Sequence, residues 1–566
     1  MSGSMRGLSH GFFALFLKLL PWLILPSHLL AASYEGPWYD FSAYTECKPD
    51  PEPPLYNGGI LQSENGEIPM AYDTTEPGAH RPAFVLGNLT ETTRYSFSCW
   101  VQIQGTDSAL IRAVLATDDS KFRCVGTTTA QNGCWSFLKG GFILDASSKT
   151  SVLFLQNTTN EVDGIEILVA SASLQPFSVE QWEMHQQDNI RTKRKRMVVI
   201  HVSDTQGNRV IGASVSVQQL AKDFPFGSAI ASTIVGNLPY QAWFLERFNA
   251  AVFENELKWY TTEPQPGKLN YTLADEMLEF IRANKVVARG HNIFWENPSV
   301  TPSWVRNLTG DDLRSAAKSR IQSLMSRYKG EFVHWDVNNE MLHFDFYEQR
   351  LGPNASLEFF GTAQQADPLA TMFMNEFNVL ETCDDVNSTV DSYISRLREL
   401  KEAGAVLQGI GLEGHFFTKP NLPLMRAVLD KLATLDLPIW LTEVDINHIF
   451  DHQTQAIYLE EVLREGFSYP FVNGIMLWTA LHPYGCYEMC LTDEDFHNLP
   501  SGDVVDRLLQ EWETKETAGV TDDHGLYTFS GFLGEYKVSV SYANKSTETT
   551  FSLGRGDETK HLNVQL

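Results

Sequence analysis

The pattern of apolar and polar positions changes twice along this chain. Between residues 33 and 187, apolar positions fall in short β-type runs separated by turn signals, such as Tyr95–Ile103, Ala109–Ala116, Thr150–Leu155 and Gly164–Ala170. Runs of this length and spacing are typical of a β-sandwich. We therefore predict an N-terminal β-sandwich over residues 33–185.

From Phe224 onwards, strand-like runs alternate with helical stretches such as Leu313–Tyr328, Val390–Ala403 and Pro423–Leu435. The eight strand-like runs are Phe224–Ile230, Ala250–Lys258, Val287–Trp295, Phe332–Glu340, Thr371–Asn378, Val406–Phe416, Pro438–Ile446 and Val472–Ala480. Eight such units fit a closed (β/α)8 TIM barrel, which needs about 250 residues. An open doubly wound sheet is the alternative, but no glycine-rich phosphate loop follows the first strand. We place the barrel, with a leading β segment, at residues 197–515.

Strand patterns return in residues 516–566, which form a small C-terminal β region. The segment TDDHGLYTFSGFLGEYKVSVSY has the same turn-then-strand rhythm as residues 197–217. Because the two pieces flank the barrel, our hypothesis is that they pair into one small β-sandwich. Residues 186–196 are polar and basic. A solvated linker is the favoured interpretation there, and a nucleic-acid patch is the alternative.

The first 32 residues have the pattern of a targeting segment. Arg6 supplies a positive start, and the mostly apolar stretch from Phe12 to Leu25 is broken by Lys18 and Pro21. A short, interrupted stretch favours a cleaved signal peptide over an uncleaved membrane anchor. We expect a secreted, extracellular glycoprotein that has no membrane contact after cleavage. Asn-x-Ser/Thr sequons occur at Asn88, Asn157, Asn270, Asn307, Asn354, Asn387 and Asn544.

The cysteines fit an oxidising compartment, but their odd number, 7, leaves at least one unpaired within the chain. Cys486 and Cys490 are close enough in sequence to close a small loop, and we predict a disulfide between them. Cys383 is our candidate for the unpaired thiol.

Composition excludes several functional classes. Lys and Arg number 43 against 70 Asp and Glu, a net charge of −27, so nucleic acid is not an expected partner. Motifs of zinc proteases, serine hydrolases and dithiol redox proteins do not occur. We expect no metal and no cofactor, and we expect a monomer. The tripeptide Arg555-Gly556-Asp557 is interpreted as a chance match to an integrin motif.

Polar and aromatic side chains gather where the predicted barrel strands end. In a TIM barrel the loops at the carboxyl ends of the strands form the active face. Apolar interior layers do not explain such a concentration of carboxylates, amides and imidazoles. The sequence therefore predicts one site that contains Glu254, Asn255, Lys258, His291, Trp295, Asn339, Glu340, Glu413, His415, Glu443, Asp445 and Trp478.

Two of these carboxylates indicate a particular chemistry. Glu340 ends the fourth strand and Glu443 lies on the seventh, three strand–helix units later, so they can face each other across the barrel mouth. Paired carboxylates carry out glycoside hydrolysis, in which one acts as an acid and the other attacks the anomeric carbon. The spacing Glu340-x-x-His343 also occurs in di-iron sites, but no second copy of it is present.

Neighbouring residues fit the same interpretation. Asn339 supplies an amide for a sugar hydroxyl near the reacting carbon. His415 and Asp445 can keep Glu443 ionised and oriented through hydrogen bonds. Trp295 and Trp478 offer flat faces on which a pyranose ring can stack.

The segments that carry these residues are FENELKW (253–259), RGHNIFW (289–295), WDVNNE (335–340), GLEGHF (411–416), LTEVDI (441–446) and LW (477–478). Together they resemble the glycoside hydrolase family 10 endo-1,4-β-xylanases of plant cell walls. The resemblance covers about residues 224–512. It implies a (β/α)8 barrel, cleavage within xylan chains with retention of configuration, and a location in the cell wall.

The resemblance also implies roles for individual residues. Glu340 would be the acid/base and Glu443 the nucleophile. The glycone subsites would be lined by Glu254, Asn255, Lys258, His291, Trp295, Asn339, His415 and Trp478. Two alternatives stay open: a xylan endotransglycosylase, and a weakly active or inactive xylan-binding wall protein.

Three positions depart from the family pattern. Glu413 stands where Gln is more frequent, and Glu296 replaces a frequent His. The loop after Trp478 lacks a second tryptophan that many members place over the bound sugar. Tyr484 or Tyr487 is a candidate to substitute for it.

The N-terminal region resembles carbohydrate-binding module family 22, in the segments YSFSCWVQI (95–103), GCWSFLKGGFIL (133–144) and EILVASASLQPFSVEQW (166–182). It is shortened before Tyr95, and Ala170 stands where the family usually has Asp. Trp100 and Trp135 fit either core positions or sugar platforms, so xylan binding by this module stays open.

Overall fold

The computed structural model describes residue 34 and residues 36–62, 70–73, 81–158 and 165–566. The chain divides into two compact units, Met1–Trp38 and Tyr39–Leu566, and every described helix and strand lies in the second. The predicted signal peptide, residues 1–32, lies outside the described residues. Among the helices of the described part of the chain, none has the length and apolar character needed to cross a membrane.

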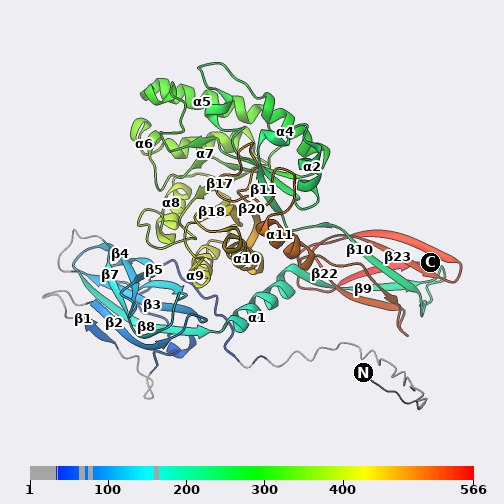
Figure 1. Ribbon diagram of the computed structural model, residues 1–566, viewed down its shortest axis with the longest axis horizontal. Coiled ribbons are helices and arrows are strands. Elements are labelled where there is room, and N and C mark those ends of the chain that lie inside the picture. Colours follow the sequence, from blue (N-terminus) through cyan, green and yellow to red (C-terminus); the bar gives the residue numbers. More distant parts are fainter. Residues whose placement is uncertain (1–33, 35, 63–69, 74–80, 159–164) are drawn as a thin grey trace, which may run out of the picture. The chain divides into compact units, whose positions relative to one another are not determined.

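Eight parallel strands close into a barrel (Figure 1). Each pairs with the next, and the last pairs back with the first through Phe226 and Ile475. The prediction of a closed barrel is confirmed, and the open sheet is wrong. Each of the eight predicted runs contains one strand of the barrel: β11 Phe226–Ile230, β12 Ala250–Phe253, β13 Val287–Gly290, β15 His334–Asp336, β17 Thr371–Glu376, β18 Gly409–Phe416, β19 Ile439–Ile446 and β20 Val472–Leu477.

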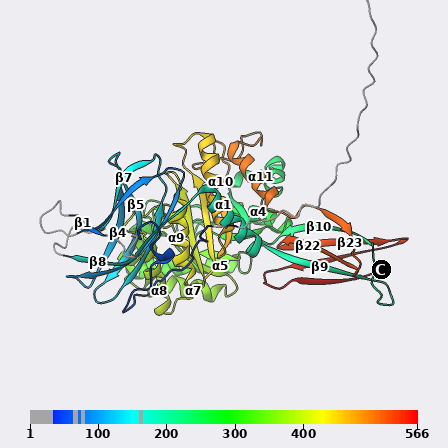
Figure 2. The same cartoon turned by 90° about the horizontal axis from the view of Figure 1, so that it is seen from below.

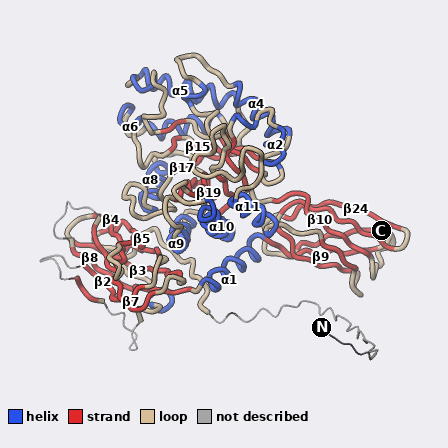
Figure 3. The backbone as a smooth tube through the Cα atoms, viewed as in Figure 1, coloured by secondary structure: helices blue, strands red, loops and turns tan. Residues whose placement is uncertain are grey.

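Helices surround the barrel strands (Figure 3). They are amphipathic: α8 buries Val390, Tyr393, Ile394 and Leu397, which lie three or four residues apart on one face. The barrel helices are α2 Leu238–Leu245, α3 Trp259–Thr262, α4 Thr272–Ala283, α5 Gly310–Arg327, α6 Phe346–Leu351, α7 Ala355–Ala366, α8 Val390–Glu402, α9 Leu422–Ala433, α10 His452–Ser468 and α11 Pro500–Glu511, with 3-10 turns η3 Ser232–Ile234 and η4 Val305–Asn307.

Strand β19 shows why the polar positions of the barrel are informative. All eight of its residues are buried, as expected for a parallel strand covered on both faces. It nevertheless contains Glu443 and Asp445. Burying a carboxyl group is costly unless partners compensate, so these two side chains require a polar environment at the barrel mouth. Two short strands, β14 (Phe294–Trp295) and β16 (Asn338–Asn339), form a separate parallel pair.

Two antiparallel sheets form the N-terminal sandwich. The first contains β1 Ala71–Asp73, β2 Arg81–Leu89, β7 Ser148–Asn157, β4 Ser108–Ala116 and β5 Phe122–Gln131, and the second β6 Ser136–Phe142, β3 Arg94–Gln104 and β8 Glu166–Phe177. A 3-10 turn, η1 (Leu55–Gly58), precedes them. Trp100 is 1% exposed and packs on Tyr44 and Phe137, so it is a core residue and not a sugar platform.

This sandwich packs directly on the barrel through β6 and α9. Lys139 of β6 and Asp430 of α9 form a 2.6 Å ion pair, and both side chains are fully buried. Asp430 also accepts hydrogen bonds from the hydroxyl groups of Tyr39 and Tyr469. A buried pair with its remaining lone pairs satisfied is costly to break from one side, because the other charge is left uncompensated.

The disulfides correct one prediction and agree with another. Cys383 is not the unpaired thiol: it is bonded to Cys124 of the sandwich, 259 residues away. The sequence offers no sign of this pair, because only the packing of sandwich against barrel brings the two thiols together. Cys99, buried in the sandwich core, is the unpaired one. The structure contains the predicted Cys486–Cys490 disulfide and a third, Cys47–Cys134.

Residues 186–196 do not form a solvated linker. They comprise the end of helix α1 (Val179–Asn189), the π-helical turn η2 (Ile190–Arg194) and the start of strand β9 (Lys195–Ser203). Ser178 caps α1 in a capping box with Gln181. Arg194 is 4% exposed. The run of basic residues predicted side chains exposed to solvent. The sequence alone could not reveal that one of them, Arg194, is buried against backbone carbonyls.

The two β segments that flank the barrel form one sandwich, as hypothesised. Strand β9 pairs with β22 and β25, and β10 pairs with β21 and β23 (Figure 2). Val198, Val215 and Val538 are among the residues of its core. The remaining bounds are β10 Ser214–Lys222, β21 Thr517–Val520, β22 Leu526–Phe532, β23 Gly534–Tyr542, β24 Lys545–Leu553 and β25 Lys560–Gln565.

Candidate active site

Glu340 directly follows β16 at the barrel mouth. The pairing of β14 with β16 places Trp295 opposite Asn339, so that Trp295 Nε1 donates a 2.6 Å hydrogen bond to Glu340 Oε2. Glu340 has φ of 58°, in the left-handed region that residues with side chains rarely adopt. Backbone strain at a buried polar residue is concentrated at functional sites in proteins.

Glu443 lies within β19 and is 5% exposed. Asn375 Nδ2 donates a 2.9 Å hydrogen bond to its Oε1 atom. His291 Nδ1 lies 3.7 Å from Oε1, and His415 Nε2 lies 3.6 Å from Oε2. The carboxyl group is therefore held between an amide and two imidazoles, which come from β17, β18 and the end of β13.

The two carboxyl groups are pushed toward opposite protonation states. Burial raises the pKa of Glu340 to about 8, and the negative charges of Glu376 and Glu443 act in the same direction. Burial also raises the pKa of Glu443, but His291, His415 and Lys258 outweigh it, so the net shift is downward. At neutral pH, Glu340 is therefore a proton donor and Glu443 is an anion. Carboxyl pairs separated in this way divide acid and nucleophile roles in glycosidases.

A third carboxyl group lies beside this pair. Glu413 and Glu443 are register partners on β18 and β19, and Asn375 Nδ2 lies 2.9 Å from an oxygen of each. Burial, followed by the charge of Glu443, raises the pKa of Glu413 well above its usual value. This shift favours the neutral form of Glu413, which is closer to the Gln that the family pattern favours at this position.

Asn375 was missed as a site residue although it lies at the end of the fifth predicted strand. It also donates to Asn339 Oδ1 at 3.0 Å, and its own Oδ1 accepts a hydrogen bond from Thr442. The signal was available, because the same rule that selected the ends of the other strands also points to this one. Asn375 therefore links Asn339 and Glu443 through hydrogen bonds to both side chains.

Asp445 lies beside His415, the residue with which it was predicted to support Glu443. Its Oδ1 atom is 2.9 Å from His415 Nδ1, and its charge also interacts with that of Glu443. His291 has an equivalent anchor in Asp336, at 3.0 Å. Each imidazole beside Glu443 is thus oriented by a buried carboxylate.

Trp295, Trp478 and Lys258 form one wall of the site. Lys258 Nζ lies 4.6 Å from the centre of the Trp295 ring and 5.7 Å from that of Trp478. The Trp478 ring also packs edge-on against His291 at 5.2 Å, and Trp478 is 5% exposed. Burial lowers the pKa of Lys258, and four carboxyl groups, Glu443 foremost, oppose this effect.

Glu254 and Asn255 lie on the other side of Lys258. Asn255 Oδ1 accepts hydrogen bonds from Tyr260 at 2.7 Å and from Lys258 at 3.4 Å. His482 Nε2 lies 2.5 Å from Glu254 Oε2. His482 belongs to the loop after Trp478, where the sequence drew attention only to aromatic residues, so this contact was not predicted.

The structure distinguishes the two tyrosines of that loop. The Tyr487 ring lies 5.9 Å from the His415 ring and is 59% exposed, whereas Tyr484 is fully exposed. Tyr487 therefore borders the site. Glu296, the other departure, is 1% exposed and accepts hydrogen bonds from Asn338 and from the Tyr347 amide, so its role is structural.

One group of side chains at the mouth is compact enough to be compared with a metal site. Ligand atoms of Glu413, His415 and Glu443 lie within 4.8 Å of one another. However, the carboxylates around His415, Asp445 first, raise its pKa well above the usual value despite its burial. A protonated imidazole donates from both nitrogens and offers no lone pair to a metal. His343, the other residue of the di-iron spacing, bonds instead to Glu376 and Asp385.

A closed (β/α)8 barrel with an acidic and an ionised carboxyl group at its mouth defines the protein as a glycoside hydrolase. Residues 216–488 match the model of glycosyl hydrolase family 10. Endo-1,4-beta-xylanase 5 of Arabidopsis thaliana is 35% identical over 97% of both chains, and endo-1,4-beta-xylanase 4 of the same plant is 33% identical over 99% of both. The chain belongs to glycosyl hydrolase family 10. Xylanase 10B of Thermotoga petrophila RKU-1, solved with xylobiose, is 24% identical with a TM-score of 0.46 over 51% of this chain and 94% of that chain.

Proposed function

We propose that the protein is a secreted, monomeric, retaining endo-1,4-β-xylanase that hydrolyses xylan in the cell wall. The observation that carries the mechanism is the opposite direction of the pKa shifts of Glu340 and Glu443. The names of the two Arabidopsis relatives support the substrate. The many sequons and three disulfides support the compartment.

Catalysis proceeds by two displacements. Glu443 attacks the anomeric carbon and forms an ester, while the bond to the leaving oxygen breaks and Glu340 gives that oxygen its proton. Glu340, now ionised, takes a proton from water, whose oxygen attacks the same carbon and releases Glu443. Each displacement inverts the configuration of the anomeric carbon, so after two displacements the product has the configuration of the substrate.

The neighbouring residues position the sugar and the nucleophile. Asn339 donates to a hydroxyl next to the reacting carbon, and Asn375 and His415 hold Glu443. Trp295 and Trp478 supply ring faces. Glu254, Asn255, Lys258 and His291 complete the glycone subsites.

Tyr487 is the aromatic residue that borders the aglycone side in place of the absent tryptophan. A sugar hydroxyl at that side can replace water in the second displacement, so oligosaccharide products longer than the substrate would show transglycosylation.

Proton NMR of the first minutes of hydrolysis of a linear β-1,4-xylo-oligosaccharide tests the proposal. We expect the β-anomer of the new reducing end to form first and to mutarotate to the α-anomer later. An α-anomer at the start would overturn the retaining mechanism. Mannan and cellulose oligosaccharides under the same conditions are the controls for the substrate, and faster cleavage of either would overturn the xylanase assignment.

A further inference from the structure

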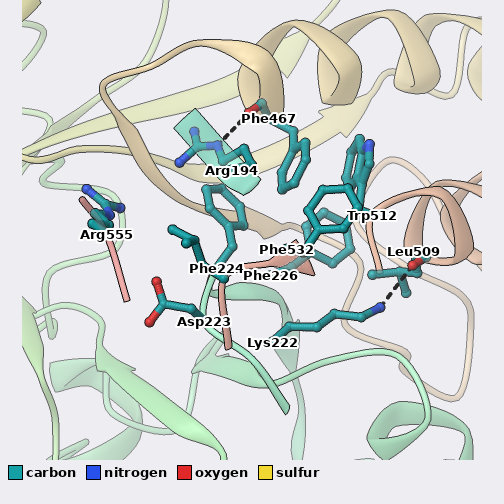
Figure 4. Close-up of a pocket in the computed structure, with 11 residues that line it drawn as sticks. Arg194, Lys222, Asp223, Phe224, Phe226, Phe467, Leu509, Trp512, Phe532 and Arg555 are labelled. Atoms are coloured by element: carbon teal, nitrogen blue, oxygen red, sulfur yellow. Dashed lines mark hydrogen bonds between the residues drawn. The ribbon is translucent and has the colours of Figure 1, made fainter. Parts of the chain in front are cut away.

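A second pocket lies at the opposite end of the barrel from the carboxyl groups. Its outer chamber has a volume of about 330 Å³ and lies among residues that precede or begin β19 and β20, together with η2 and the loop between β24 and β25. This volume falls within the range of small-molecule sites, about 300–1,000 Å³. Arg194, Leu533 and Arg555 also line a smaller inner chamber of about 30 Å³ (Figure 4).

Positive charge dominates the outer chamber, which is unusual in a chain of net charge −27. Its cationic side chains are Lys193, Arg194, Lys195 and Arg555, against the two carboxylates Asp436 and Asp557. Among the described residues, no ion pair joins any of these four cations to a carboxylate. Arg194 packs on the Phe224 and Phe467 rings and Lys195 Nζ lies 4.2 Å from the centre of the Phe532 ring, contacts that leave their positive charge without a counter-ion. Like charges that line one pocket without a carboxylate partner favour an anion.

Arg194 is the fixed element of this pocket. Its Nε donates to the Phe467 carbonyl at 2.8 Å, and its Nη2 donates to the carbonyls of Tyr469 and Val472 at 2.8 and 2.7 Å. Among the described residues, Nη1 has no hydrogen-bond partner, and it is not sealed from solvent. Arg194 as a whole is 4% exposed; two of its guanidinium nitrogens are held by carbonyls, and the third is left for a ligand in the pocket.

Arg555 faces the same space from a loop that is held in place. Arg196 donates to the carbonyls of Gly554, at 2.9 Å, and Glu558, which fixes both ends of the loop. Arg555 and burial both lower the pKa of Arg194, which shows that the two guanidinium groups act on each other. A bound anion would relieve this repulsion. Asp223, in the inner chamber, acts on Arg194 in the opposite direction.

An aromatic ring distinguishes the ligand from a simple ion. Phe471 lines the outer chamber and is 49% exposed, although its neighbours in the chain are partly or fully buried. An exposed ring beside guanidinium groups suits a ligand with a flat apolar face and a carboxylate. A sugar ring that carries a carboxylate has both features.

We propose that this basal pocket, defined by Lys193, Arg194, Phe471 and Arg555, binds a uronic acid residue of a polysaccharide. The uronate carboxylate contacts Arg194 Nη1 and Arg555, and the sugar ring lies on Phe471. Because the pocket is at the amino ends of the barrel strands, it holds an acidic polysaccharide without entering the catalytic mouth. The proposal does not depend on which sugar the mouth hydrolyses.

The test compares binding of methyl β-glucuronide and methyl β-glucoside to the full-length protein by saturation-transfer NMR and titration calorimetry. We expect the glucuronide to bind and the glucoside to bind at least tenfold more weakly. The double variant Lys193→Glu/Arg555→Glu should weaken glucuronide binding at least tenfold and leave kcat and KM for a neutral xylo-oligosaccharide unchanged.

Arg191→Glu is the matched control. Arg191 belongs to the same basic run, but it is 69% exposed, pairs with Asp188 and does not line the pocket. An equal loss of binding in this variant would show a general charge effect and would overturn the proposal. Equal binding of glucoside and glucuronide, or displacement of the glucuronide by sulfate at constant ionic strength, would also overturn it.

Discussion

The mouth and the base of the barrel solve opposite electrostatic problems. At the mouth, Glu340, Glu413 and Glu443 are buried close together, and burial, reinforced by the charge of Glu443, raises the pKa values of Glu340 and Glu413. At the base, Arg194 is buried among backbone carbonyls, and its guanidinium group packs on the rings of Phe224 and Phe467. The mouth gathers carboxyl groups that oppose one another's ionisation, whereas the base holds one guanidinium group on three backbone carbonyls beside a second guanidinium group that repels it.

Because of this difference, we expect substitutions at the two ends of the barrel to affect different properties of the protein. In TIM-barrel enzymes the carboxyl face carries the chemistry and the opposite face carries stability. Substitutions at the mouth should therefore change the rate strongly and the stability little or favourably. Substitutions at the base should do the reverse.

Replacing the proposed nucleophile should give the largest effect. Glu443→Ala removes the carboxylate that is proposed to form the ester, and we expect kcat to fall by roughly 10⁵-fold. Steady-state release of reducing ends from xylan measures this. Glu399→Gln, an exposed residue of α8 that pairs only with Arg396, is the control and should keep full activity. Substantial activity in the Glu443→Ala variant would contradict the assignment.

Glu340→Gln should lower kcat by about 10²–10⁴-fold, because no proton reaches the leaving oxygen. It should also change the pH dependence of stability. The folded-state pKa of Glu340 is raised from 4.5 to about 8, so the wild-type protein gains stability from this group at low pH and loses it as the pH rises from 4.5 to 8.

The loss amounts to about 1.4 kcal/mol for each pH unit in this window. Glutamine does not titrate, so the variant does not lose this stability. Its free energy of unfolding should therefore increase relative to that of the wild type from pH 5 to pH 8. Urea unfolding at several pH values measures this difference. Parallel curves for the two proteins would show that Glu340 is not a raised-pKa group.

Tyr487→Ala should have a smaller effect, confined to binding. Loss of a stacking face worth about 0.5–1.5 kcal/mol should raise KM for xylan about 2- to 12-fold and leave kcat unchanged. Tyr484→Ala is the matched control, since this ring is fully exposed in the same loop. An equal change of KM in both variants would contradict a contact between the Tyr487 ring and the bound sugar.

The smallest effect on the rate is expected at the base. Arg194→Met removes hydrogen bonds to three carbonyls and leaves them buried, so the free energy of unfolding should fall by about 2–4 kcal/mol. The value of kcat for a neutral xylo-oligosaccharide should stay within twofold. Thermal melting and initial rates measure the two quantities, and Arg191→Met, an exposed residue, should change neither. A large loss of kcat in the Arg194→Met variant would contradict the division into a catalytic mouth and a stabilising base.

Much of the fold and most of the site could be predicted from particular residues. Eight apolar runs located the barrel strands, because parallel strands covered on both faces must be apolar along their length. Glu340, Glu443 and Trp295 were located because polar side chains at strand ends have no packing explanation. Asn375 was missed although the strand-end rule also points to it, whereas His482 was missed because a single imidazole in a loop has no distinctive pattern in a sequence.

The sequence by itself determined the barrel, the two sandwiches and the types of residue at the mouth of the barrel. These features follow from local periodicity and from where each strand ends. Only the tertiary structure decided which distant groups meet. It paired Cys383 with Cys124 and Lys139 with Asp430, and it buried Arg194 in a run that looked like a solvated linker. Such contacts join segments hundreds of residues apart. Their energy depends on distance and burial in space, and neither quantity is written in the local pattern of the chain.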